Sequence, residues 1–311
     1  MRAILLGAAG FIGTNLAIKL SEQTEDVITL VDREESYFNT LKKLNLPNVE
    51  YLVSEFDENS DFDHLLEHQD VVYHLVSTTA PTTSNQKISE ELTANVVVTA
   101  NLLDSCVRCK VKKVIFLSSG GTVYGKETRC PLNEEAITYP ISSYGIQKIT
   151  IEKLLYLYHY LYNLDYRVIR LANPYGPYQR PNGLLGAVTT FTYKALKKEK
   201  ITVYGDGSVV RDFIYIDDAI RGIMNIANGN VKHRTFNLGS GYGTSIKQVL
   251  EVVEHVLKCN VDVEYVKGRT VDVPVNYLDI GRYEKSYGKL EPISLEEGIK
   301  KTADFMCENM L

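Results

Sequence analysis

The chain has 311 residues, of which 44% are hydrophobic and 23% are charged. This composition is typical of a folded globular protein and excludes disordered and collagen-like chains. The 34 basic and 39 acidic residues give a net charge of −5. Nucleic-acid binding requires a concentrated positive surface, and a membrane span requires about 18 consecutive apolar residues, so we expect neither partner.

The chain contains five cysteines, an odd number that does not imply a disulfide framework. Cys106 and Cys109 form a single C-x-x-C pair without a second pair or a nearby histidine, so we expect packed thiols and no metal site. Residues 1–7 are too short for a signal peptide. Together these features predict a cytoplasmic protein.

Short apolar segments alternate with helical patterns through the first half of the chain. Buried strands separated by helices are typical of a parallel sheet covered on both faces, so the predicted fold is α/β, a Rossmann-type doubly wound parallel sheet. In the segment 143–163 the tyrosines alternate as in a strand, but leucines three and four residues apart favour a helix. We expect strands over 2–6, 27–31, 49–53, 71–75, 113–117 and 166–171, and helices over 11–21, 87–109 and 143–163.

Prolines and glycines crowd residues 174–183 and mark the crossing into a second domain. Beyond it we expect mixed short strands and helices over 185–198, 245–257 and 294–309. The predicted organisation has two parts. Residues 1–172 form a cofactor domain, and residues 173–311 form mainly a smaller α/β substrate domain, with about 213–240 returning to the first.

A glycine cluster follows the first predicted strand and opens the first helix. Glycine allows a pyrophosphate to approach the backbone closely, and a helix N-terminus offers free N–H groups. We therefore expect this loop to bind a dinucleotide through Gly7, Gly10, Phe11, Ile12 and Gly13.

Asp32 ends the second predicted strand, nineteen residues after Gly13. A carboxylate at this place accepts hydrogen bonds from the ribose hydroxyls of NAD and repels the 2′-phosphate of NADP. The predicted cofactor is therefore NAD, although the neighbouring Arg33 is a feature that suits NADP.

Tyr144 and Lys148 lie four residues apart at the start of a predicted helix, so their side chains share one face. A free phenol has a pKa near 10 and is a poor base at neutral pH. A cation about 4 Å away, at an effective dielectric constant of about 20, is worth about 4 kcal/mol, or about three pKa units. Together with the positive charge of an oxidised nicotinamide, it is expected to make Tyr144 a usable base.

These residues carry a resemblance to the extended short-chain dehydrogenase/reductases, in the NAD-dependent epimerase/dehydratase branch typified by UDP-glucose 4-epimerase. The resemblance runs nearly end to end. It includes residues 118–125, which are similar to the family's SSxxxVYG stretch, and residues 173–177, which are similar to the loop entering the substrate domain. It implies polysaccharide biosynthesis as the context, and a homodimer that pairs through helices 87–109 and 143–163.

The resemblance also assigns cofactor and substrate contacts by position. On the cofactor side it implies Glu55, Phe56, Leu75, Asn95 and Ser118. Arginine forks suit diphosphates because their donors bind two oxygens at once. For the nucleotide sugar the resemblance implies Asn173, Arg180, Tyr204, Arg211, Arg269, Asp272 and Asn276.

One position departs from the family pattern. The family has Ser or Thr four residues before the tyrosine of VYG, where this chain has Gly120. Thr122 lies two residues further on and faces the same side of an extended segment. We expect Thr122, or otherwise Ser119, to supply the missing hydroxyl; the alternatives are that water fills the gap or that the enzyme is slow.

The same stretch separates the reactions known in the family. Its 4,6-dehydratases resemble one another in an Asp-Glu pair just before VYG, and its decarboxylases carry a Glu, whereas this chain has Gly121 and Thr122. The resemblance therefore favours a 4-epimerase that acts on a nucleoside-diphosphate sugar through a 4-keto intermediate. Two alternatives stay open: another NAD-dependent nucleotide-sugar dehydratase or reductase, or a non-catalytic dinucleotide-binding sensor.

The predicted sugar is a UDP-hexose, a UDP-N-acetylhexosamine or a UDP-uronate. Asn276 stands where UDP-hexose 4-epimerases often carry a bulky tyrosine, and the smaller side chain could admit an N-acetyl group. Arg180 occupies a place where some uronate epimerases hold a sugar carboxylate.

Overall fold

The structure is a computed structural model that describes residues 1–311 except 24, 26, 82, 127–128, 182–185 and 269–272. Within it the chain divides into two compact units, each built from several segments of the sequence. The first unit comprises Met1–Ser119, Ser142–Ile169 and Asn230–Thr235, and the second comprises Gly120–Ile141, Arg170–Gly229 and Phe236–Leu311.

A seven-stranded sheet with the order β11-β6-β5-β4-β1-β2-β3 is the largest sheet of the described chain. The register pairs β1 in parallel with β2 and β4, β2 with β3, and β4 with β5. This arrangement confirms the predicted Rossmann-type fold. The strands are β1 (Ala3–Leu6), β2 (Ile28–Asp32), β3 (Val49–Val53), β4 (Val71–His74), β5 (Lys113–Ser119), β6 (Asp165–Leu171) and β11 (Thr235–Leu238).

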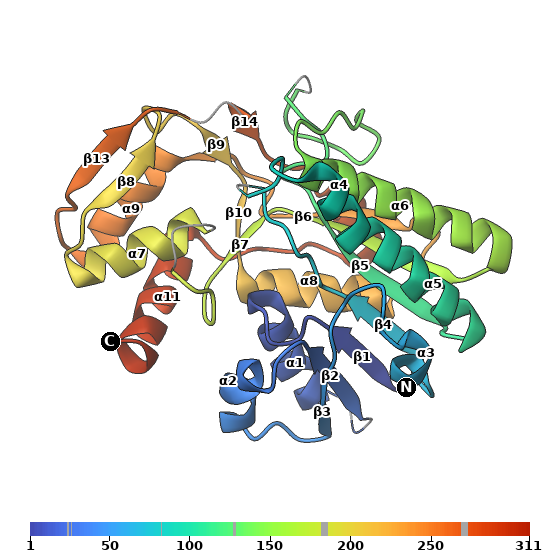
Figure 1. Cartoon of the computed structure of the whole chain (residues 1–311). Coiled ribbons are helices and arrows are strands. Elements are labelled where there is room, and N and C mark those ends of the chain that lie inside the picture. Colours follow the sequence, from blue (N-terminus) through green and yellow to red (C-terminus); the bar gives the residue numbers. More distant parts are fainter. Residues whose placement is uncertain (24, 26, 82, 127–128, 182–185, 269–272) are drawn as a thin grey trace. The chain divides into compact units, whose positions relative to one another are not determined.

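Helices cover this sheet in the first unit, and Figure 1 shows α5 and α6 lying side by side. The predicted helix over 87–109 is not uniform, because a π-helical turn over Thr93–Val97 separates α4 from α5. The core between strands and helices is apolar and includes Ile4, Leu102, Phe116 and Ile151. The helices are α1 (Phe11–Gln23), α2 (Asn39–Lys43), α3 (Phe62–Leu66), α4 (Ile88–Leu92), α5 (Val98–Arg108) and α6 (Ser143–Tyr162).

The second unit contains three small sheets. β7 (Asn173–Tyr175) pairs with β10 (Phe213–Tyr215), and β8 (Ile201–Tyr204) pairs with β13 (Val263–Val266). The third sheet has the order β12-β9-β14. Its strands are β12 (Thr244–Ser245), β9 (Val210–Arg211) and β14 (Val275–Asn276).

Three helices of the second unit, α7 (Ala187–Lys197), α9 (Ile246–Leu257) and α11 (Leu295–Asn309), confirm predicted segments and pack against one another. Two described helices of this unit were not predicted, α8 (Ile216–Asn228) and α10 (Gly281–Tyr287), and the same is true of α2 and α3 in the first unit. Buried isoleucines at 216, 220 and 223 are the helical signal that could have located α8. No helix within the described residues is long and apolar enough to span a bilayer.

Candidate active site

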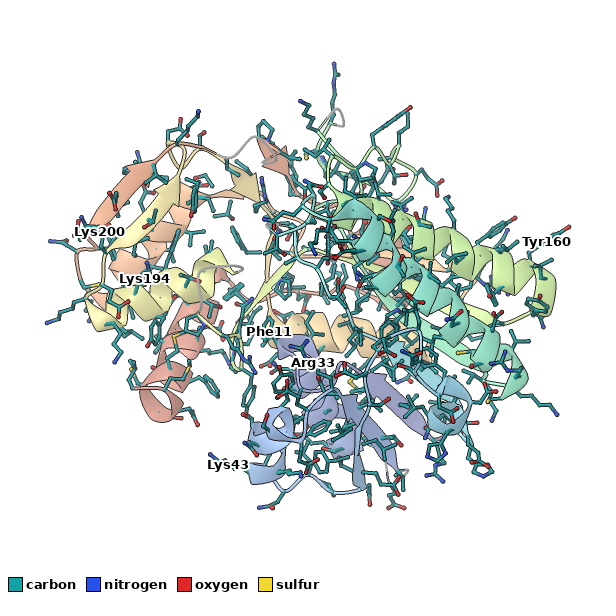
Figure 2. All side chains as sticks on the ribbon, in the orientation of Figure 1. Phe11, Arg33, Lys43, Tyr160, Lys194 and Lys200 are labelled. Carbon is teal, nitrogen blue, oxygen red and sulfur yellow. The ribbon has the colours of Figure 1, made fainter. Side chains whose placement is uncertain are left out.

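The glycine loop joins β1 to α1 and has little room for side chains. Gly7 has φ +86°, a conformation that favours glycine, and its N–H donates to the carbonyl of Val31 at 2.9 Å. A Cβ at Gly13 would lie 2.5 Å from the Gly7 oxygen, so a side chain there would displace the backbone. The bare loop leads directly to Phe11 at the start of α1 (Figure 2), which is the geometry that a pyrophosphate needs.

Asp32 lies beside this loop at the end of β2. Its carboxylate accepts hydrogen bonds from the backbone N–H of Ala9 at 3.0 Å and of Arg33 at 2.9 Å. The guanidinium of Arg33 donates to the hydroxyl of Tyr37 at 2.9 Å. The loop amides thus hold the Asp32 carboxylate at the edge of the glycine loop, where it fits an adenosine ribose.

Glu55 and Phe56 follow β3. Glu55 is exposed, whereas the Phe56 ring packs against His74 with the ring centroids 5.1 Å apart. A cavity of about 490 Å³ opens next to Phe56. Besides Phe56 it is lined by Asp57, Glu58, Asn59, Ser89, Glu90, Thr93, Ala94 and Val98.

Asn95 is buried in the π-helical turn, where it fastens the segment that follows β4. Its Oδ1 accepts from the N–H of Thr78 at 2.9 Å, and its Nδ2 donates to the Thr78 hydroxyl at 2.7 Å. Leu75, on the same segment, donates its N–H to the carbonyl of Leu6 at 3.1 Å. The Asn95 side chain therefore ties Thr78, three residues beyond Leu75, to the π-helical turn.

Tyr144 and Lys148 lie on the first two turns of α6, which begins after Ser142. The Ser142 hydroxyl caps the helix by accepting from the N–H of Gly145 at 3.2 Å. The Lys148 Nζ donates to the carbonyl of Leu117 at 2.9 Å and lies 5.5 Å from the centroid of the Tyr144 ring. The predicted pair is therefore on one helix face, with its ammonium fixed to the end of β5.

Burial dominates the titration of this pair. It raises the pKa of Tyr144 to about 12 and lowers the pKa of Lys148 to about 8, while the charge of Glu152 raises the latter. Without the cofactor, the loss of solvent around the phenol outweighs the effect of the Lys148 ammonium, so the expected lowering of the Tyr144 pKa by lysine and nicotinamide together stays a prediction. Bringing the pKa of Tyr144 down requires the positive charge expected from the nicotinamide.

Ser118 and Ser119 end β5. Ser118 is buried and its hydroxyl donates to Oε1 of Glu152 at 2.5 Å, whereas Ser119 is half-buried. Sequence reasoning missed Glu152. The signal for it is its spacing, since Glu152 follows Lys148 by the same four residues that separate Lys148 from Tyr144.

The second unit carries the glycine that replaces the family hydroxyl, together with Thr122 and Asn276. The Thr122 Oγ1 is buried and has no hydrogen-bond partner among the described residues. Asn276 is 1% exposed, and its Nδ2 donates to the Gly120 carbonyl at 3.2 Å. A buried hydroxyl without a hydrogen-bond partner costs free energy, and a bound ligand that pairs with it would remove this cost.

The remaining residues predicted to hold the nucleotide sugar are placed as follows. Arg211 on β9 pairs in register with Asn276 on β14, and its Nη1 donates to the carbonyl of Val210 at 2.9 Å. The Asn173 Nδ2 donates to the carbonyl of Asp212 at 2.8 Å. Tyr204 and Arg180 are exposed, and Arg269 and Asp272 lie outside the described residues.

Comparison with known proteins identifies one family. The model of the NAD dependent epimerase/dehydratase family matches residues 3–239. The chain is 32% identical to a putative UDP-glucose 4-epimerase of Methanocaldococcus jannaschii, over 98% of both chains.

Two solved structures share the whole fold. A UDP-glucose 4-epimerase of Thermotoga maritima, solved with UDP-glucose, is 30% identical with a TM-score of 0.91 over 100% of both chains. A UDP-glucuronic acid 4-epimerase of Bacillus cereus, solved with UDP-glucuronic acid and NAD, is 26% identical with a TM-score of 0.89 over 99% of both. With its glycine loop, Asp32 and the Tyr144–Lys148 pair inside the matched segment, the chain belongs to the NAD-dependent epimerase/dehydratase family, and NAD is its cofactor.

Proposed function

We propose that this protein is a UDP-sugar 4-epimerase that oxidises and re-reduces C4 of the sugar. The observation that carries the proposal is the Tyr144–Lys148 pair of the first unit, and Thr122 of the second unit offers a further hydroxyl. Tyr144 and Lys148 share one face of α6, and the buried Oγ1 of Thr122 has no partner among the described residues. Thr122 stands where the decarboxylases of the family carry a Glu, and Gly121 and Thr122 stand where its dehydratases carry an Asp-Glu pair, so the carboxylates for those reactions are missing.

The proposed reaction needs one base and one electrostatic partner from the protein. Tyr144, as the phenolate, takes the proton of the C4 hydroxyl, and Lys148 stabilises this phenolate. The hydroxyl of Thr122 forms a hydrogen bond with the C4 hydroxyl of the sugar. NAD would be held by the glycine loop and Asp32, and it would supply the hydride acceptor and donor for C4. The 4-keto sugar then rotates so that its opposite face meets the hydride donor. Tyr144 returns the proton when C4 is reduced on that face.

The sugar specificity is proposed from two positions. The Asn276 amide donates a hydrogen bond to the Gly120 carbonyl. The asparagine side chain is smaller than the tyrosine common at this position in UDP-hexose 4-epimerases, which supports acceptance of a 2-N-acetyl group. Arg180 is exposed, and a guanidinium there suits a uronate carboxylate. A UDP-hexose, a UDP-N-acetylhexosamine and a UDP-uronate are therefore the substrates to test.

We further infer that residues 1–172 mainly bind NAD and residues 173–311 mainly bind the nucleotide sugar. A cytoplasmic location is supported by the five cysteines, all of which are free thiols. A role in polysaccharide biosynthesis follows from the proposed substrates.

A homodimer is supported by the outer surface of α6. Large apolar side chains lie exposed on it, and Figure 2 shows Tyr160 at the far end of this helix. Such a surface is typical of a protein interface. The exposed large hydrophobic residues of α6 are Ile146, Tyr156, Leu157, Tyr160, Leu161 and Tyr162.

The deciding experiment incubates the NAD-loaded protein with each of the three classes of UDP-sugar and follows the configuration at C4 by NMR. Epimerisation of one class, lost in Tyr144→Phe, supports the proposal. Loss of water from the sugar would instead identify a dehydratase. NAD binding without change in any sugar would identify a sensor.

A further inference from the structure

Two consecutive residues at the end of β5 are tied to α6, each through a different side chain. The Lys148 ammonium donates to the Leu117 carbonyl at 2.9 Å, and the Ser118 hydroxyl donates to Glu152 Oε1 at 2.5 Å. Lys148, Ser118 and Glu152 are only 5%, 5% and 6% exposed. Strand and helix are therefore joined by a lysine and a glutamate one helical turn apart.

The charge of the Glu152 carboxylate acts on the neighbouring ammonium of Lys148. A nearby carboxylate favours the charged form of an ammonium. Burial lowers the pKa of Lys148 to about 8, and Glu152 is the group that acts in the opposite direction. Without Glu152, burial would drive the ammonium toward its neutral form.

Among the residues that the structure describes, the other titratable groups around Lys148 do not supply this charge. On α6 the neighbour is Tyr144, whose pKa burial raises to about 12, so it is neutral at pH 7. On β4 it is His74, whose pKa burial and Lys148 lower to about 3, so it too is neutral.

We propose that Glu152 is a positioning residue for the Tyr144–Lys148 pair: its carboxylate, oriented by Ser118, keeps Lys148 charged and fixed at the end of β5. Turnover depends on the charge of Lys148 because this lysine stabilises the phenolate of Tyr144 only in its charged form. The consequence for turnover rests on the proposed function, whereas the consequence for the charge of Lys148 does not.

The first test is the pH dependence of kcat for the sugar that the NAD-loaded protein epimerises. In Glu152→Gln the alkaline loss of activity should move to lower pH by about one unit, since a close opposite charge is worth about one to three pKa units. Glu152→Asp keeps the charge, so its pH profile should stay close to that of the unmodified protein. Glu251→Gln removes an exposed charge on α9 and should leave the profile in place. A folded Glu152→Gln protein with the unmodified pH profile overturns the proposal.

The second test needs no catalysis. Lysines are labelled with ¹³C at Cε in the NAD-free protein, and the Lys148 signal is assigned as the one missing in Lys148→Arg. Lys148 should be charged at pH 7 in the unmodified protein and should titrate about one unit lower in Glu152→Gln. A neutral Lys148 at pH 7, or an unshifted titration, overturns the proposal.

If Glu152→Gln does not fold, the charge of Lys148 at pH 7 in the unmodified protein becomes the test. A charged Lys148 supports the proposal, and a neutral Lys148 overturns it. If no UDP-sugar is epimerised, the proposed function fails while the lysine titration still judges Glu152.

Discussion

Leu278 occupies the space that a side chain at Gly120 would need. A Cβ built at Gly120 would lie 2.6 Å from Cδ1 of Leu278 and 3.1 Å from the carbonyl oxygen of Arg170. The Leu278 side chain is fully buried, so it has little room to move aside. A side chain at position 120, such as the family's Ser or Thr, would therefore require Leu278 to shift.

The cost of Gly120→Ser should consequently depend on Leu278. Overpacking a core typically costs about 1–3 kcal/mol, so Gly120→Ser should lower the free energy of unfolding by that amount. In a Leu278→Ala background, itself destabilised by about 2–5 kcal/mol, the serine should cost far less. Urea denaturation of the four proteins measures the coupling, which we expect to reach about 1 kcal/mol or more. An equal cost of the serine in both backgrounds would contradict the steric explanation.

Thr122→Val removes the unpartnered hydroxyl at nearly constant volume. If this hydroxyl shares the substrate proton, turnover should fall about 10²-fold or more, the scale of a positioned proton-transfer group. Tyr144→Phe should cost at least as much, and the double variant little beyond that, because groups that act as one unit are not additive. Steady-state rates measure this, with Thr122→Ser as the matched control that keeps the hydroxyl. Unchanged turnover in Thr122→Val would point to Ser119 or an ordered water.

Asp32 should set the preference for NAD over NADP. Its carboxylate is fixed beside the glycine loop by the N–H of Ala9, where it would repel a 2′-phosphate. Asp32→Ala should bring the dissociation constants of NADP and NAD closer together. Each tenfold change in their ratio corresponds to about 1.4 kcal/mol of binding free energy. Titration of the unmodified and variant proteins with both dinucleotides measures the ratio. Equal affinity for NADP and NAD in the unmodified protein would refute the assignment.

His74 should make the fold sensitive to acid. Its ring is buried between Phe56 and Phe116, and burial, with Lys148, lowers its pKa from 6.5 to about 3. Between these values the unfolded chain binds a proton that the folded chain does not, so stability falls as the pH drops below 6.5. The expected slope is about 1.4 kcal/mol per pH unit.

His74→Gln should remove that slope from the pH dependence of the unfolding free energy, measured by urea denaturation between pH 7 and 4.5. His68→Gln changes an exposed histidine and serves as the control. A His74→Gln protein with the same slope as the unmodified protein would show that another group titrates.

The exposed apolar residues of α6 should join two copies of the chain. Light scattering at micromolar concentration should give twice the mass of the 311-residue chain. Leu157→Lys with Leu161→Lys places two charges on the surface and should yield monomers, because unpaired charges are costly to bury in an interface. A monomeric unmodified protein would exclude the proposed interface.

The sequence by itself determined the elements whose information is local. The order of strands and helices follows from short-range hydrophobic periodicity, and the glycine loop with Asp32 follows from spacing along a single strand–helix–strand unit. The shared helix face of Tyr144 and Lys148 needs only the helical repeat. These features were predictable because each depends on residues close together in the chain.

Only the tertiary structure decided what depends on distant neighbours and on burial. Asn276 donates to Gly120 across 156 residues, and no local pattern predicts that contact. The π-helical turn around Asn95 departs from the regular period on which the helix prediction rests. Burial raises the pKa of Tyr144, and the extent of burial is set by how distant segments of the chain pack.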